Sequence, residues 1–203
     1  MKSHLFFLIS FVLFLGAGCK KATPGTDYQA TKVVTADSAA VVSPHPLATR
    51  VGLEILEKGG NAIDAAVAVQ FALAVVYPRA GNIGGGGFMV VRTKDGETAA
   101  LDYREKAPLA AHRDMYLDSL GNVIDGLSTM GHLAAGVPGT VAGLFEAHKK
   151  YGRIRDMKEL IQPAIELAER GFQISATEAN RLNGFQEGFR KYNEEPNPFI
   201  KDS

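Results

Sequence analysis

The residue of this chain whose type and position best suit ligand binding is Arg104, at the end of a predicted strand. It follows the alternating stretch 101–103 and is followed directly by Glu105. A guanidinium group can bind a carboxylate through two parallel hydrogen bonds, and a strand end would hold it rigidly yet accessibly. The same spacing permits a surface salt bridge with Asp102 or Glu105, and spacing alone favours that structural role.

Four consecutive glycines, Gly84 to Gly87, lie shortly before this arginine and lead into an apolar strand. A phosphate-binding loop needs a helix after its glycines, and the P-loop also needs a lysine and a hydroxyl residue. Because a strand follows here, we expect the run to pack closely against a buried helix. A backbone surface beside a bound substrate is the alternative interpretation.

No pattern in the sequence predicts a catalytic residue, a metal ligand or a cofactor. None of the five histidines stands at metal-ligand spacing from another ligand, which argues against a zinc site. There is no G-x-S-x-G motif, and no Ser-His-Asp order stands out. Thr140, in VPGTVAG, is predicted to be an early residue of a helix rather than a nucleophile.

The first 18 residues have the pattern of a signal peptide: Lys2, an apolar stretch over 5–15, then small residues. This stretch is too short to span a bilayer comfortably. The only cysteine, Cys19, ends LGAGC, which resembles a bacterial lipobox. We therefore expect a lipidated Cys19, a polar tether over 19–30 and a periplasmic protein anchored to a membrane, with the outer membrane favoured. An ordinary cleaved signal with an incidental cysteine is the alternative.

The composition is that of an ordinary folded domain. Hydrophobic residues make up 46% of the chain, and 22 basic residues balance 22 acidic ones. This balance gives no indication of a nucleic-acid partner. A chain of 203 residues is long enough for one domain with a sizeable core.

Hydrophobic periodicity and capping residues predict the elements that position Arg104. Asn61 and Ser175 are the predicted N-caps, and Gly59 and Gly171 are the predicted C-caps. The helix over 62–76 is apolar on nearly all sides, so we expect it to be buried on all sides. Two strand pairs with helices on one side predict a layered α/β or α+β domain. The predicted helices are 47–58, 62–76, 138–151, 156–170 and 175–190, and the predicted strands are 39–42, 88–93, 98–103 and 132–137.

Three segments in fixed order resemble the N-terminal part of the gamma-glutamyltranspeptidase family: GGNAIDAAVAVQFALAVVYP, GNIGGGGFMVV and LDYREKAP. With SPHPLATRVGLEILEKGG, AAGVPGTVAGLFEAHKKYG and LIQPAIELAERGFQIS, the resemblance covers about Thr31 to Phe199. It implies an α+β fold of the N-terminal-nucleophile hydrolase type, an αββα sandwich. Residues 31–203 would be a C-terminally truncated, large-subunit part of it, and the threonine nucleophile would lie outside them.

The resemblance also implies a function. The family cleaves γ-glutamyl amides such as glutathione and passes the glutamyl group to water, amino acids or peptides, after a self-cleavage that yields a small subunit. The arginine of its D-x-R-E-x-A-P segment binds the substrate α-carboxylate. The resemblance implies that role for Arg104, with Glu105 supporting the arginine. It therefore favours substrate binding by Arg104 over the surface salt bridge that spacing alone favours.

Residues 1–203 alone are expected to be inactive. The alternatives are an acylase of the same fold but other specificity, such as a cephalosporin acylase, and a non-catalytic exported binding domain.

Overall fold

The computed structural model describes residues 33–194, 196–197 and 199–200. The chain divides into two units, Met1–Asp37 and Ser38–Ser203, and the fold below is that of the second. The predicted signal peptide, Cys19 and the tether lie outside the described residues. No helix in the described part is long and apolar enough to cross a membrane.

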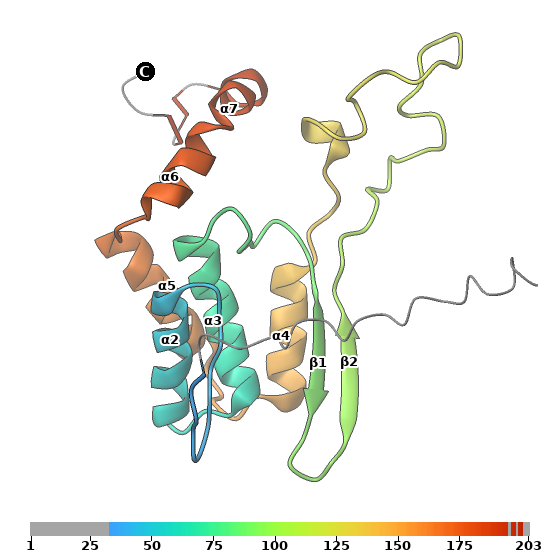
Figure 1. Cartoon of the computed structure of the whole chain (residues 1–203). Coiled ribbons are helices and arrows are strands. Elements are labelled where there is room, and N and C mark those ends of the chain that lie inside the picture. The colour runs from blue at the N-terminus through green and yellow to red at the C-terminus, as the bar shows by residue number, and fades with distance from the viewer. Residues whose placement is uncertain (1–32, 195, 198, 201–203) are drawn as a thin grey trace, which may run out of the picture. The chain divides into compact units, whose positions relative to one another are not determined.

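Helix α3 (Ala62–Val76) is the centre of the core, and it contacts α2, α5 and α4. Asn61 begins it, as predicted, through a capping box: its side chain accepts from the backbone of Asp64, whose carboxylate accepts from the backbone N–H of Asn61. Figure 1 shows α3 between α2 and α4. Most of its side chains are buried, but Ala62 and Ala66 are exposed, so the prediction of burial on all sides is wrong on that face.

Helices α2 (Pro46–Glu57) and α5 (Met157–Arg170) pack against α3 and confirm the predicted helices there. Each is followed by a glycine with positive φ, Gly59 at 90° and Gly171 at 72°. Glycine adopts that conformation without the steric penalty of a side chain, which is why both helices end where the sequence predicts. The N-cap of α5 is Asp156.

The predicted hairpin is present as β1 (Phe88–Arg92) and β2 (Thr98–Asp102), antiparallel, with Phe88 opposite Asp102. Helix α4 (Thr140–Tyr151) contacts β2 and lies between α3 and the hairpin (Figure 1). Val91 faces this packed side and is buried. The other face of β1 presents Phe88 and Val90 to solvent.

Two predicted strands are absent. Residues 39–42 form no strand, and 132–137 contain the 3-10 helix η1 (His132–Ala134) and a single bridge from Val137 to Lys106. A strand needs a partner over several residues, and in the described part only β1 and β2 provide one for each other. There is therefore one strand pair here rather than two.

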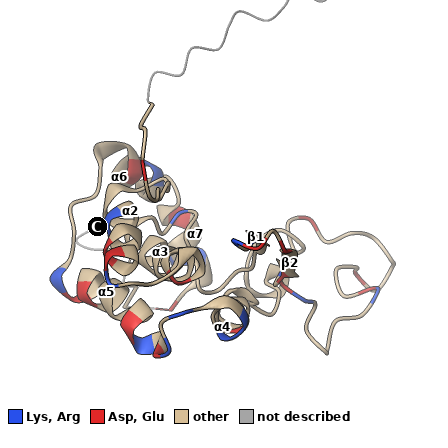
Figure 2. Ribbon diagram, turned by 90° about the horizontal axis from the view of Figure 1, so that it is seen from below, with Lys and Arg blue, Asp and Glu red and all other residues tan. Residues whose placement is uncertain are grey.

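The predicted helix 175–190 is two helices, α6 (Ala176–Asn183) and α7 (Gln186–Tyr192). Ser175 caps α6 as expected, and the chain leaves the helix at Gly184. Figure 2 shows basic and acidic residues interspersed along the helices.

Candidate functional site

Arg104 lies two residues after the end of β2, where the hairpin ladder makes its last backbone bonds. The N–H of Tyr103 donates to the carbonyl of Gly87 at 3.0 Å. The N–H of Arg104 itself donates to Oδ1 of Asp102 at 3.0 Å. The Arg104 backbone is therefore fixed while 64% of its side chain is exposed. This is the rigid and accessible position that the sequence predicts.

The two predicted substrate-binding residues lie together. Nε of Arg104 is 3.5 Å from Oε2 of Glu105, and its Cζ is 5.8 Å from the ring centroid of Phe88. The salt bridge considered from spacing alone is thus present, with Glu105 rather than Asp102. An exposed ion pair contributes only about 0–1 kcal/mol, so a ligand carboxylate can replace Glu105 at little cost.

Glycines surround the backbone from Tyr103 to Glu105. A Cβ on Gly86 would lie 2.8 Å from Cα of Arg104, and one on Gly87 would lie 2.8 Å from the Tyr103 ring. From the opposite side, a Cβ on Gly139 or Gly143 would overlap Tyr103. The strand end therefore fits into a space that only glycines leave open.

The glycine run thus packs against the end of β2 and not against the buried helix, so that prediction is wrong. Gly81, just before the run, does pack against α3, because a Cβ there would overlap the carbonyl of Leu73. The signal that could have found the true neighbour is the second set of glycines at 136, 139 and 143, in the segment that opens α4.

Tyr103, next to Arg104, is half-buried at the end of β2. Burial raises the pKa of its phenol above the ordinary value, so the group is neutral at physiological pH. Its hydroxyl donates to the carbonyl of Phe88 at 3.3 Å. The ring packs over Gly143 of α4 and so ties the strand end to that helix.

A cavity of about 310 Å³ lies beside Arg104, between the end of β2 and the first turns of α4. Its charged lining includes Arg104, Lys106 and Glu146. A hydrogen bond from Lys150 lowers the pKa of Glu146, which is therefore anionic at neutral pH. The size lies at the lower end of the range of small-molecule sites.

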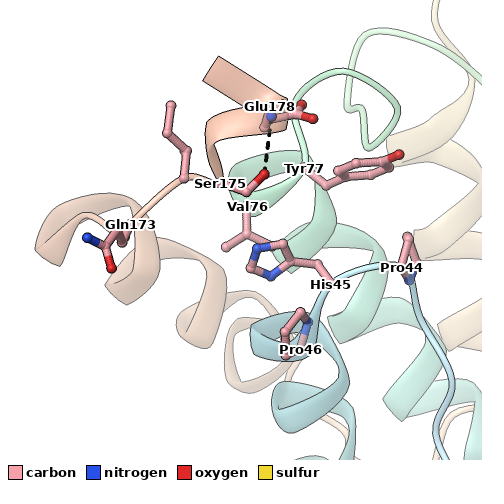
Figure 3. Close-up of a pocket in the computed structure, with 9 residues that line it drawn as sticks. Pro44, His45, Pro46, Val76, Tyr77, Gln173, Ser175 and Glu178 are labelled. Atoms are coloured by element: carbon pink, nitrogen blue, oxygen red, sulfur yellow. Dashed lines mark hydrogen bonds between the residues drawn. The ribbon is translucent and has the colours of Figure 1, made fainter. Parts of the chain in front are cut away.

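A second cavity, of about 420 Å³, lies between the start of α2, the end of α3 and residues 173–178 (Figure 3). It contains none of the predicted site residues. Glu178 on its wall is buried and pairs through Oε2 with Nε of Arg79 at 3.3 Å, and its N–H donates to Oγ of Ser175. The Arg79–Glu178 ion pair joins α6 to the turn after α3, and no sequence pattern predicted it.

No catalytic pair is present in the described part of the chain. Among these residues no group of His, Cys, Asp and Glu could hold a metal ion. The hydroxyl of Thr140 is buried at the first turn of α4 and donates to an amide, Oδ1 of Asn82, rather than to a base. The site as described can bind and orient a carboxylate.

The chain is similar to proteins of a known family. The family model described as Gamma-glutamyltranspeptidase matches residues 48–202. The glutathione hydrolase proenzyme of Pseudomonas sp. (strain A14) is 54% identical over 158 residues, which cover 78% of this chain and 27% of that protein. The proenzyme of Escherichia coli (strain K12) is 46% identical over 181 residues, covering 88% and 31%. The chain thus spans less than a third of the length of these relatives.

Solved structures agree in fold. The gamma-glutamyltranspeptidase of Helicobacter pylori matches with a TM-score of 0.80 and 52% identity, covering 85% of this chain and 49% of that one. A cephalosporin acylase from Bacillus halodurans matches with a TM-score of 0.63 and 26% identity, covering 84% and 33%. The predicted α+β fold of the N-terminal-nucleophile hydrolase type is confirmed by these neighbours.

Proposed function

Because the chain belongs to the gamma-glutamyltranspeptidase family, we propose that it is the N-terminal part of an enzyme that cleaves γ-glutamyl amides such as glutathione. The glutamyl group would pass to water, an amino acid or a peptide. The observation that carries the proposal is an accessible Arg104 on a fixed backbone beside a small cavity. The glutathione hydrolase proenzymes that the chain resembles support it.

In this proposal Arg104 binds the α-carboxylate of the γ-glutamyl group. The planar guanidinium offers two parallel N–H donors, which fix both the position and the orientation of the carboxylate. The γ-carbonyl is then held at a set distance from Arg104 by the substrate's own carbon chain. Glu105 keeps the guanidinium oriented when no substrate is bound. This chain thereby supplies positioning, which lowers the entropic barrier of the reaction.

The covalent steps belong to a threonine outside these residues, on the small subunit released by self-cleavage. Its hydroxyl oxygen attacks the γ-carbonyl while its α-amine takes the proton. The leaving amine departs with that proton, and water or an acceptor amine then attacks the acyl-enzyme. No cofactor takes part.

The similarity to a cephalosporin acylase supports a second candidate specificity, for glutaryl amides. A glutaryl group carries the same carboxylate as a γ-glutamyl group and lacks only the amine, so Arg104 suits both. The whole protein should be assayed with γ-glutamyl anilide and glutaryl anilide. We expect preferential turnover of the γ-glutamyl compound. The reverse preference would indicate the acylase, and absence of both turnover and self-cleavage would indicate a non-catalytic binding domain.

We further propose that Cys19 is lipidated and holds the protein at a bacterial membrane, facing the periplasm. The support is the LGAGC sequence after an apolar stretch and before a polar tether. One acyl chain binds a membrane only weakly, so stable anchoring requires more than one. Fractionation of the wild type and of Cys19→Ser tests this: the variant should leave the membrane fraction. Equal membrane retention of both proteins would contradict the proposal.

A further inference from the structure

Asn82 and Thr140 form a hydrogen-bonded link beside Arg104 that the proposed function does not use. The hydroxyl of Thr140 donates to Oδ1 of Asn82 at 2.6 Å. The N–H of Gly85 donates to the same oxygen at 3.0 Å. Thr140 is fully buried, so this hydroxyl has no access to water as a replacement partner. We call these contacts the Asn82–Thr140 link.

The link holds the glycine run against the N-terminus of α4. That helix has no side-chain cap. Instead the carbonyl of Gly85 accepts from the N–H groups of Gly139 and Thr140, at 2.8 and 3.0 Å. A backbone carbonyl thus satisfies donors that a helix start leaves unpaired. Asn82 in turn accepts from the N–H of Gly85, so these hydrogen bonds join the glycine loop to the start of the helix.

The joined segments pack against the backbone of Tyr103 and Arg104. A Cβ on Gly86, next to Gly85, would lie 2.7 Å from the carbonyl oxygen of Tyr103 and 2.8 Å from Cα of Arg104. A Cβ on Gly139, next to Thr140, would overlap the same carbonyl. Movement of either glycine therefore displaces the backbone that carries the guanidinium. A small displacement at a binding group can reduce catalysis about 100-fold.

We propose that Asn82 and Thr140 are positioning residues for Arg104: their link sets where the guanidinium meets the substrate carboxylate. The inference rests on the proposed function of Arg104. Neither side chain touches the substrate in this account. The link acts only through the two glycine segments that enclose the strand end.

Paired substitutions separate the hydrogen bonds from the volume of the side chains. Thr140→Val removes the hydroxyl and keeps the shape, whereas Thr140→Ser keeps the hydroxyl. Asn82→Leu removes the acceptor, whereas Asn82→Asp keeps an oxygen for both donors. In the whole protein, Thr140→Val and Asn82→Leu should raise KM for γ-glutamyl anilide about tenfold with a smaller effect on kcat. The KM of Thr140→Ser and Asn82→Asp should remain close to that of the wild type, and self-cleavage should continue in all four variants.

The Arg104→Ala background distinguishes this inference from the function on which it rests. If the link acts through Arg104, Thr140→Val should raise KM no further once Arg104 is gone. An equal rise in both backgrounds would overturn the inference alone, as would wild-type KM in Thr140→Val. Loss of self-cleavage in both Thr140→Val and Asn82→Leu would show that the link serves folding, which also overturns it. Unchanged KM in Arg104→Ala would overturn the proposed function and the inference together.

Discussion

A carboxylate that approaches Arg104 meets a guanidinium whose ion-pair partner is itself 37% exposed. Exchange of Glu105 for a ligand therefore breaks a weak, solvent-screened contact and forms one in a cavity. The gain comes from the geometry of the guanidinium as much as from its charge. Substitution of Arg104 by lysine, which removes only the geometry, should therefore affect substrate binding differently from substitution by alanine, which removes both geometry and charge.

We expect Arg104→Lys to raise KM strongly, because lysine keeps the charge but loses the planar two-point contact. Arg104→Ala should lose on the order of 2–5 kcal/mol of transition-state binding, as when one side of a desolvated charge pair is removed. Steady-state kinetics of the whole protein measure both. Self-cleavage should continue in each variant, since that step involves no free substrate. Its loss in both would instead assign Arg104 a structural role.

Asp64 is a buried residue with a structural role that the sequence did not reveal. Its carboxylate accepts from the N–H groups of Asn61, Arg153 and Ile154 at 2.9, 3.0 and 3.2 Å. It thereby joins the start of α3 to the loop after α4. The side chain is inaccessible to water, so water does not compete for these hydrogen bonds.

Asp64→Ala should lower the free energy of unfolding by about 3 kcal/mol or more, because it leaves buried N–H donors without an acceptor. Asp125→Ala, at an exposed loop position, is the matched control and should change stability little. Urea unfolding of the whole protein measures both values. Equal midpoints for the two variants would show that Asp64 is dispensable.

The end of β2 and α4 approach each other closely at glycines. The Tyr103 ring lies against α4, where a Cβ on Gly143 would overlap it. The position of Arg104 is therefore sensitive to small changes in volume on α4.

Gly143→Ala should destabilise the protein by about 1–3 kcal/mol through overpacking and raise KM for γ-glutamyl anilide. Gly84→Ala provides the control, because no atom lies within 4 Å of the position of a Cβ there. Thermal unfolding and KM should both stay near wild type in that variant. If both substitutions behave alike, the close packing of Tyr103 on α4 does not position the site.

The helices could be predicted because their signals are local. Asn61 and Ser175 cap helices where the sequence predicts N-caps, and Gly59 and Gly171 end two helices. Strand pairing is non-local, so the apolar segments 39–42 and 132–137 were predicted as strands without knowledge of a partner. The prediction of the hairpin is confirmed because its two strands are adjacent in sequence.

The site was predicted only in part for the same reason. Arg104 and Glu105 are neighbours in sequence, and their proximity follows directly. The contacts of Asn82 with Thr140, and of Gly143 with Tyr103, join segments more than 30 residues apart. Sequence periodicity within one segment does not predict a contact with a distant segment.

For the whole molecule, apolar surface remains exposed in the described unit. Phe88 is 63% and Val90 83% exposed on the open face of the hairpin. A groove of about 560 Å³ is lined largely by Val41, Val42, Leu56 and the exposed face of α3. Exposed apolar surface of this kind is typical of an interface. It fits a chain that spans less than a third of its relatives.

Purified residues 1–203 should therefore show no turnover of γ-glutamyl anilide. In the described part, no Ser or Thr hydroxyl is hydrogen-bonded to a histidine ring or a carboxylate, so no nucleophile is activated. The release of aniline should match a heat-killed control. Any reproducible excess over that control would mean that the catalytic group lies within these residues.

Recognition of the substrate α-carboxylate by Arg104 can be measured with two donors that differ by that group. In the whole protein, kcat/KM should be compared for γ-glutamyl anilide and 4-aminobutanoyl anilide, in the wild type and in Arg104→Ala. We expect the wild type to prefer the γ-glutamyl compound by about 30-fold or more and this preference to fall to about one in the variant. An undiminished preference in Arg104→Ala would contradict it.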